Sequence, residues 1–173
     1  MDSEASTLLG IATRDASSEN GPVERLDLPR YAGNWYVIAH VPSRAERRGV
    51  DSVTATYLLN ADGTVAVRNA YRNAKGLFVE ANAIARTTTI PGALKQRFAP
   101  RWLSWLPSVW SDYWVIDLDP SYQWAMVGSP TRKTLSVRSR HPTMKRALYE
   151  RLIRAAARRG YRVADLVMTS ELE

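Results

Sequence analysis

The sequence predicts an all-β fold, an eight-stranded up-and-down antiparallel barrel with a C-terminal α-helix packed on the outside. From residue 33 onward, short segments rich in Val, Thr, Tyr and Trp are separated by turn signals at intervals of about 8 to 12 residues. A single helical pattern follows these segments. We favour a barrel over a sandwich because closure removes exposed strand edges without a second sheet.

Eight segments are expected to form the strands, and the short links between them favour antiparallel neighbours. Asp62-Gly63 is a tight hairpin signal, and Pro91-Gly92, Asp119-Pro120 and Ser129-Pro130 mark other turns. The expected strands are residues 34–41, 53–59, 64–72, 77–88, 93–98, 113–118, 123–128 and 134–140.

The helix is expected over residues 142–159. Met144, Leu148, Leu152 and Ala155 recur there at helical spacing, so they form an apolar stripe that could pack on the barrel wall. Gly160 follows the pattern and is a good stop signal.

The chain of 173 residues suits one globular domain, which we place at residues 28–173 behind a flexible polar N-terminal tail, residues 1–27. The charge is divided unevenly between the two parts. Residues 1–28 hold two arginines and six acidic residues, whereas the remainder holds 22 basic and 11 acidic side chains. The domain is therefore strongly basic, and such a surface attracts phosphate-rich partners, either nucleic acid or anionic lipid headgroups.

The composition excludes several function classes. The chain has no cysteine, which excludes disulfides, thiolate metal sites, a thiol nucleophile and a lipid anchor attached through cysteine. No apolar run approaches the roughly 18 to 20 residues that a membrane-spanning helix needs. His40 and His141 are expected at opposite ends of the barrel, too far apart to share a metal ion, so we predict neither a metal nor a cofactor.

Alternating strand directions assign each loop to one end of the barrel. The tight loops at 61–63, 90–92 and 119–121 form the base, and the longer loops at 42–51, 73–76, 99–112 and 129–133 form a mouth above a lumen wide enough for one small ligand. The mouth loops carry an amphiphilic set that could dock on an anionic membrane, or whose tryptophans could fold inward as a lid. Its main members are Arg44, Arg47, Arg48, Arg101, Trp102, Trp105 and Trp110.

Three ordered segments resemble the lipocalin motifs, in particular those of bacterial outer-membrane lipocalins of the apolipoprotein D-like branch. The first is the Gly-x-Trp pattern of Gly33-Asn34-Trp35, the second is residues 111–119, and the third is Ser139-Arg140 ahead of the helix. The similarity spans about residues 26–170. It implies a calyx that binds small hydrophobic ligands, and it implies that Trp35 closes the base under a stacked Arg140 guanidinium. Gly33, Trp35 and Arg140 are thus structural residues.

The resemblance and strand alternation together predict which side chains line the calyx. Trp35 facing inward puts Val37 and Ala39 on the same face, and Tyr57 and Asn69 correspond to pocket positions of the apolipoprotein D branch. Tyr113 and Trp114 lie on opposite faces, and the sequence does not decide which reaches the ligand. The full predicted lining is Val37, Ala39, Tyr57, Asn69, Tyr71, Tyr113, Trp114, Ala125, Val127, Ser136 and Arg138.

Ser136 and Arg138 stand where relatives often have an aromatic and an aliphatic residue. Alternation puts both on the face of Arg140, so Arg138 would point into the lumen, where an unpaired charge is costly. An anionic ligand group could neutralise it. Two alternatives remain open: a local twist or bulge turns Arg138 outward, or an internal acid such as Asp117 satisfies it.

The predicted function is the binding, transport or storage of an amphiphilic lipid such as a fatty acid or lysophospholipid. The alternative is a lipocalin-fold enzyme, natural or engineered, acting on a small hydrophobic substrate, although no residue set forms a convincing catalytic site. A basic barrel that binds nucleic acid is a further rival that we do not favour. The protein is expected to be a monomer or homodimer, located in the bacterial cell envelope, periplasm or outer membrane, if an export signal has been removed, and in the cytoplasm otherwise.

Overall fold

The computed structural model describes residues 19–42, 51–73, 75–98 and 105–173. Its strands are β1 Gly33–His40, β2 Asp51–Leu59, β3 Val65–Arg72, β4 Phe78–Thr87, β5 Ala93–Arg97, β6 Ser111–Leu118, β7 Trp124–Gly128, β8 Leu135–Ser139 and β9 Val167–Met168. Its α-helices are α1 Leu28–Tyr31 and α2 Arg146–Arg158, and its 3-10 helices are η3 Pro107–Val109 and η4 Val163–Asp165.

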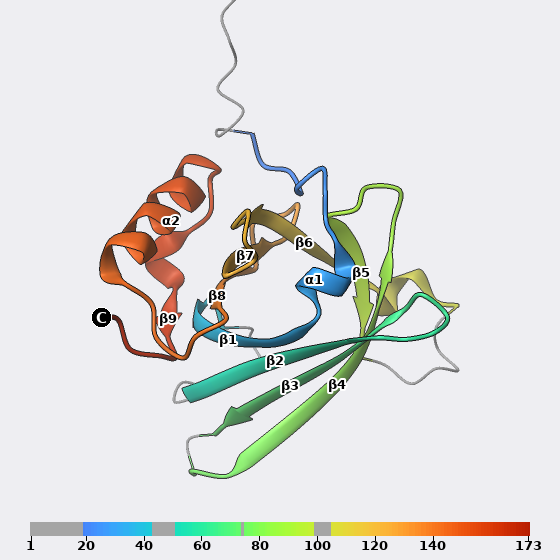
Figure 1. Ribbon diagram of the computed structural model, residues 1–173, viewed down its shortest axis with the longest axis horizontal. Helices are drawn as coiled ribbons and strands as arrows, with labels where there is room; N and C mark the ends of the chain where they lie inside the picture. The colour runs from blue at the N-terminus through green and yellow to red at the C-terminus, as the bar shows by residue number, and fades with distance from the viewer. Residues whose placement is uncertain (1–18, 43–50, 74, 99–104) are drawn as a thin grey trace, which may run out of the picture.

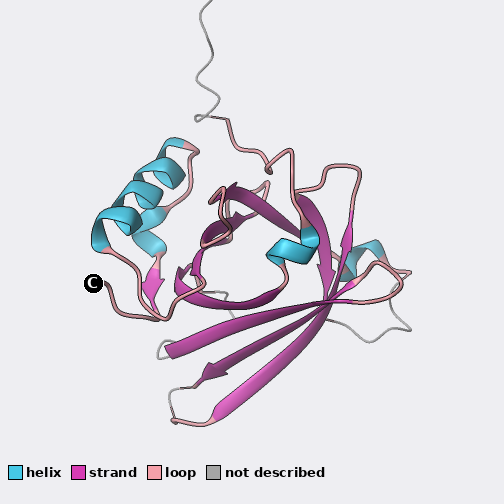
Figure 2. Ribbon diagram, in the orientation of Figure 1, coloured by secondary structure: helices cyan, strands magenta, loops and turns pink. Residues whose placement is uncertain are grey.

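Strands β1 to β8 form a closed antiparallel barrel. Each strand pairs with the next in sequence, and β1 closes the ring by pairing with both β2 and β8 (Figure 2). The short β9 adds to β1 through Ala39 and His40, beyond the part of β1 that pairs with β2. The predicted eight-stranded barrel with an outer helix is confirmed.

Local signals explain where turns and helices fall. At the predicted hairpin turn, Asp62 Oδ1 accepts hydrogen bonds from Thr64 N at 2.9 Å and Thr64 Oγ1 at 2.6 Å, and Gly63 has a φ of +81°, a conformation that glycine adopts at no steric cost. Helix α2 ends ahead of Gly160, which has a φ of +85°. The predicted turn at Asp62-Gly63 and the predicted end of the helix at Gly160 are confirmed.

Helix α2 begins at Arg146, later than predicted. The backbone of Met144 pairs with the C-terminal segment, because Glu173 N donates to Met144 O at 2.9 Å and Arg146 N donates to Glu173 O at 2.8 Å. Residues 142–145 therefore form bends and an isolated bridge rather than the first helical turn.

Two apolar clusters fill the structure. One lies inside the barrel around Trp35, Tyr57, Val67 and Tyr113. The other lies between the barrel wall and the C-terminal part, around Ile38, Met126, Leu152 and Tyr161. Figure 1 shows α2 and β9 together beside β7 and β8, and β2, β3 and β4 away from the helix. The helix thus covers one side of the barrel.

Residues 19–27 pack on the barrel, which corrects the predicted flexible tail over residues 1–27. Val23 N donates to Val115 O at 2.8 Å, and Gly92 N donates to Val23 O at 3.2 Å. Asn20 Oδ1 accepts a hydrogen bond from the Tyr161 hydroxyl at 2.8 Å. These short contacts to β6 and the C-terminal segment are not visible in composition, while residues 1–18 lie outside the described part of the chain.

Candidate functional site

One end of the barrel is closed by Trp35 and Arg140. Trp35 is fully buried, and its indole N–H donates to Tyr31 O at 2.8 Å. The guanidinium carbon of Arg140 lies 3.8 Å from the centroid of the Trp35 ring. This is the stacked pair that the resemblance implied, and it acts as a stopper under the lumen.

Backbone carbonyls hold Arg140 in place. Its Nη1 donates to Asn34 O at 2.8 Å, its Nη2 donates to Arg30 O at 2.7 Å and Tyr31 O at 3.2 Å, and its Nε donates to Tyr122 O at 3.2 Å. Glycine is needed at position 33 beside it, because the φ of +95° there is a conformation that residues with a side chain rarely adopt. Burial lowers the pKa of Arg140, although the guanidinium stays charged near neutral pH.

A cavity of about 620 Å³ occupies the barrel above this stopper and reaches the mouth. Most of the predicted lining residues face it, as a group from β1, β3, β6, β7 and β8. These are Val37, Asn69, Tyr71, Tyr113, Val127, Ser136 and Arg138. The prediction missed lining residues nearer the mouth, among them His40, Val53, Ala81, Phe98 and Lys133.

Ala39 does not line the cavity, because β1 contains a bulge. The pairing of β1 with β8 shifts between Val37 and Ala39, so Ala39 lies opposite Val137, a member of the helix-side cluster. His40 then lies opposite Ser136, and both side chains face the cavity. Strict alternation from Trp35 gave the wrong face for Ala39.

Trp114 also faces away from the lumen. It packs with the helix-side cluster, whereas Tyr113 belongs to the cluster inside the barrel. The structure thus assigns the inward position to Tyr113. Tyr57 and Ala125 face inward as predicted, but both are buried in the inner cluster and neither is among the residues that line the cavity.

The floor of the cavity is a group of tyrosines around Arg138. The Tyr113 hydroxyl lies 2.7 Å from the Tyr31 hydroxyl and 2.9 Å from the Tyr57 hydroxyl, so the three phenols form a hydrogen-bonded chain. Arg138 Nε donates to Ser136 Oγ at 3.0 Å, and Arg138 Nη1 donates to the Tyr57 hydroxyl. The guanidinium carbon also lies 5.6 Å from the Tyr57 ring centroid and 5.4 Å from that of Tyr113.

Neither alternative for Arg138 is found among the residues that the structure describes. Arg138 faces the lumen because β8 keeps a regular alternation, with Val137 on the helix side and Ser136 on the cavity side. Asp117 lies in a bulged part of β6, opposite Met126 of the helix-side cluster, where its carboxylate is 3.8 Å from Arg159 Nη2. The carboxylate suggested as an internal partner therefore pairs elsewhere.

The floor holds a fixed positive charge among neutral phenols. Burial raises the pKa of Tyr113 well above its usual value, even though Arg138 lowers it, and burial likewise raises the pKa of Tyr31. Burial lowers the pKa of Arg138, but its interactions with Tyr113, Tyr57 and Tyr31 outweigh this effect and raise it. Tyr31 and Tyr113 are thus neutral and Arg138 is charged near neutral pH.

The mouth is amphiphilic, although its exposed residues are partly different from those predicted. Trp105 is 75% exposed, but Trp110 stacks under Arg86, whose guanidinium carbon is 4.1 Å from its ring centroid, and neither tryptophan lines the cavity as a lid would. Arg44, Arg47, Arg48, Arg101 and Trp102 lie outside the described residues.

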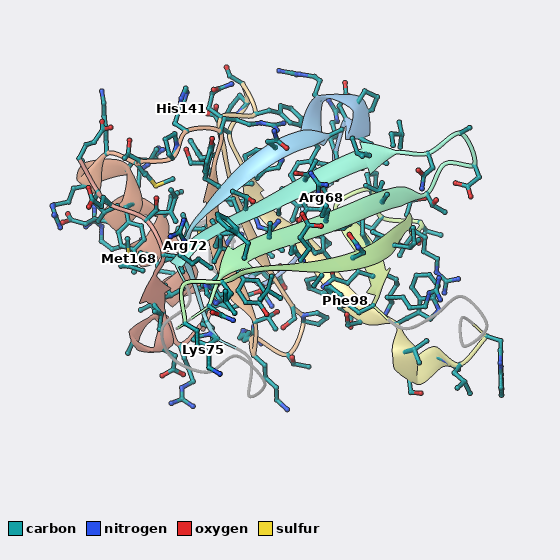
Figure 3. All side chains as sticks on the ribbon, turned by 90° about the horizontal axis from the view of Figure 1, so that it is seen from below. Arg68, Arg72, Lys75, Phe98, His141 and Met168 are labelled. Atoms are coloured by element: carbon teal, nitrogen blue, oxygen red, sulfur yellow. The ribbon has the colours of Figure 1, made fainter. Side chains whose placement is uncertain are left out.

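The hairpin between β3 and β4 adds apolar and basic groups that the prediction did not single out. Leu77 is 61% and Phe78 is 70% exposed, and the Arg72 guanidinium carbon lies 4.9 Å from the Phe78 ring centroid. Figure 3 shows Lys75 on this hairpin, at the opposite edge of the molecule from His141 near the base. Exposed apolar side chains and cations thus occur together at the mouth.

No group of three or more His, Asp or Glu side chains within the described ranges is arranged to hold a metal ion. No helix in those same ranges is long and apolar enough to cross a membrane.

A closed eight-stranded barrel with a stopper at one end and a lumen open at the other defines a class of small-ligand-binding proteins. Residues 26–171 match the family described as a lipocalin-like domain. The chain belongs to this lipocalin-like family, as its motifs predict. Membership of this family favours the binding of a small hydrophobic ligand over catalysis.

Relatives and solved structures agree with this assignment. The chain is 40% identical to Temperature-induced lipocalin-1 of Arabidopsis thaliana over 153 residues, 86% of this chain and 81% of the relative. It is 34% identical to the outer membrane lipoprotein Blc of Escherichia coli over 152 residues, with the same coverage. Insecticyanin of the tobacco hornworm Manduca sexta shares the fold, with a TM-score of 0.65 at 16% identity over 88% of this chain and 84% of that one.

Proposed function

We propose that this protein binds an amphiphilic lipid, a long-chain fatty acid or a lysophospholipid, in the barrel lumen and carries or stores it. The observation that supports this most is the cavity of about 620 Å³, which has Val37, Ala81 and Val127 in its wall and is stoppered at one end. Burying an acyl chain there contributes about 0.8 kcal/mol per methylene. The protein's side chains leave the lumen open, and the bound ligand would exclude water from it.

The predicted residues that line the cavity are the proposed ligand contacts. Val37 and Val127 would contact the acyl chain of the ligand. Asn69, Tyr71 and Tyr113 would offer both contact area and hydrogen bonds. Tyr57 and Ala125 would support the floor from below. Ala39 and Trp114 have no such role in the proposal, because their side chains face the helix side.

An anionic membrane surface is the proposed source or destination of the lipid. Leu77 and Phe78 are exposed on the β3–β4 hairpin together with the basic side chains Arg72 and Lys75, and Trp105 is exposed in the mouth loop before η3. Aromatic groups favour a lipid–water interface, and cations are attracted to anionic headgroups. The bacterial Blc relatives are outer membrane lipoproteins by name, which supports a location in the cell envelope.

Native mass spectrometry of the purified protein, followed by lipid extraction, tests the proposal. We expect one amphiphile per barrel. Val37→Trp, which fills the lumen from β1, should remove the co-purifying lipid, whereas Leu58→Trp on the exposed outer face of β2 should retain it. Circular dichroism would establish that both variants fold. Equal lipid content in the two folded variants, or no lipid and no uptake of added fatty acid, would refute binding in the lumen.

A further inference from the structure

We propose that the floor of the lumen is a carboxylate site formed by Arg138, Ser136 and Tyr113, and that a free fatty acid binds with its carboxylate at the closed end and its tail toward the mouth. This inference rests on the proposed function, because it requires an amphiphile in the lumen. It goes further by choosing the head group, the residue that binds it and the direction in which the ligand lies.

The charge of Arg138 is not neutralised within the described protein. Its hydrogen-bond acceptors are two neutral hydroxyls, those of Ser136 at 3.0 Å and of Tyr57, and its ring contacts are neutral as well. No carboxylate among the described residues contributes to its pKa or pairs with it within 4.0 Å. A partly buried cation without a counterion is unfavourable, so an anion delivered by a ligand would be stabilised there.

Arg138 also keeps donors for a ligand. A guanidinium has five N–H groups, and the hydrogen bonds to Ser136 and Tyr57 use Nε and Nη1, which leaves Nη2 without an acceptor among the described residues. Arg138 lines the cavity, as do Ser136 and Tyr113, so these donors can be approached from above. Charge-assisted hydrogen bonds from arginine to a carboxylate are among the strongest in proteins.

The confined floor favours a carboxylate over a lysophospholipid phosphate. The stopper of Trp35 and Arg140 and the chain of three phenols close the space beneath Arg138. A fatty-acid carboxylate ends the molecule, so nothing has to pass beyond it. A lysophospholipid phosphate carries a further alcohol group that would need room below the guanidinium, where buried side chains lie.

A second cation, Lys133 at the mouth, could compete for the ligand carboxylate, but it attracts an anion more weakly than Arg138 does. Lys133 lines the upper cavity, but its side chain is exposed, so water and salt screen its attraction for an anion. Arg138 lies deeper in the lumen, where water and salt screen its attraction for an anion less. Thr134, next to Lys133 at the mouth, and Arg138 are four residues apart, which corresponds to about 13 Å of extended chain. A tail that starts at Arg138 would run past Val37 and Val127 and reach Phe98 at the rim.

Isothermal titration with palmitate and hexadecanol, which share a chain length, tests the head group. Arg138→Gln keeps a donor for Tyr57 but removes the charge, and it should weaken palmitate binding by about tenfold or more. Hexadecanol affinity should change less than about twofold, since its head is neutral. Lys133→Gln is the matched control at the rim and should change palmitate affinity by less than about twofold. Arg138→Lys keeps the charge and should retain most of the palmitate affinity.

The orientation is tested with stearic acids that carry a nitroxide at carbon 5 or at carbon 16, exposed to a water-soluble reductant. We expect the nitroxide at carbon 5 to be protected and the one at carbon 16 to be reduced quickly. The opposite order would overturn the inference.

The outcomes separate the two proposals. If folded protein binds neither palmitate nor hexadecanol, binding of an amphiphile in the lumen fails and the carboxylate site fails with it. If both ligands bind but Arg138→Gln leaves palmitate affinity unchanged, or Lys133→Gln carries the loss, only the carboxylate site is refuted. A lysophospholipid whose affinity falls as steeply as that of palmitate in Arg138→Gln would refute the choice of head group.

Discussion

The stopper and the floor of the lumen each contain one arginine at the lower end of β8, and their surroundings differ sharply. Arg140, just below the strand, stacks on Trp35 and donates hydrogen bonds to four backbone carbonyls. Arg138 donates to two side-chain hydroxyls and faces the cavity. The same side chain type therefore closes the barrel in one region and presents an available cation in the other.

The two arginines differ in the groups that compensate their positive charge. Four backbone carbonyls accept hydrogen bonds from Arg140, which ties its guanidinium into the fold. Arg138 has two neutral hydroxyls as acceptors and no carboxylate partner among the described residues, so an anionic ligand could supply its counterion. A structural arginine should thus affect stability when it is replaced, whereas a binding arginine should affect affinity.

Arg140→Gln should have the largest effect on stability. The change removes charge-assisted hydrogen bonds and the stacking on Trp35, so we expect the free energy of unfolding to fall by about 2 to 4 kcal/mol. Chemical denaturation followed by tryptophan fluorescence measures it. A loss below about 1 kcal/mol would mean that the stopper is not a structural lock.

The features that depend on turns, motifs and regular strand alternation could be predicted from the sequence. Turn signals such as Asp62-Gly63 and the ordered motifs around Trp35 and Arg140 predict the barrel and its closed end. The inward position of Arg138 follows from alternation, because β8 has no bulge between Ser136 and Ser139 in its pairing with β7.

The side-chain positions that depend on β-bulges could not be predicted, because the apolar pattern of the sequence does not indicate where a bulge occurs. One extra residue in β1 moves Ala39 to the helix side and His40 to the cavity, and another in β6 takes Asp117 out of reach of the lumen. The phenol chain was missed for a related reason. Tyr31 comes from α1, outside the predicted strands, so alternation does not bring its hydroxyl to Tyr113.

The phenols of the floor should make stability depend on alkaline pH. Burial raises the pKa of Tyr31 and Tyr113 in the folded state, while unfolded tyrosines ionise near about pH 10. Their contribution to stability is therefore complete below about pH 10 and is lost as the pH rises toward the folded-state pKa. Tyr113→Phe should reduce the slope above pH 10 by up to about 1.4 kcal/mol per pH unit.

Urea unfolding at several pH values between 9 and 11.5 measures this slope, and absorbance at 295 nm follows tyrosine ionisation. A wild-type slope that Tyr113→Phe leaves unchanged would show that the phenol is not shielded in the folded state. The floor would then be more hydrated than its hydrogen-bonded chain implies.

Arg138→Gln should have the smallest effect on stability, within about 1 kcal/mol of the wild-type free energy of unfolding. The change removes a cation that lacks a counterion in the described protein, which is favourable, and it weakens the hydrogen bonds to Ser136 and Tyr57, which is unfavourable. Denaturation of delipidated protein measures the balance, with Arg140→Gln as the paired variant. Added palmitate should then stabilise the wild type more than Arg138→Gln, because the ligand supplies the missing negative charge. If the two variants lose equal stability without lipid, Arg138 is a structural residue like Arg140, and the contrast between floor and stopper does not hold.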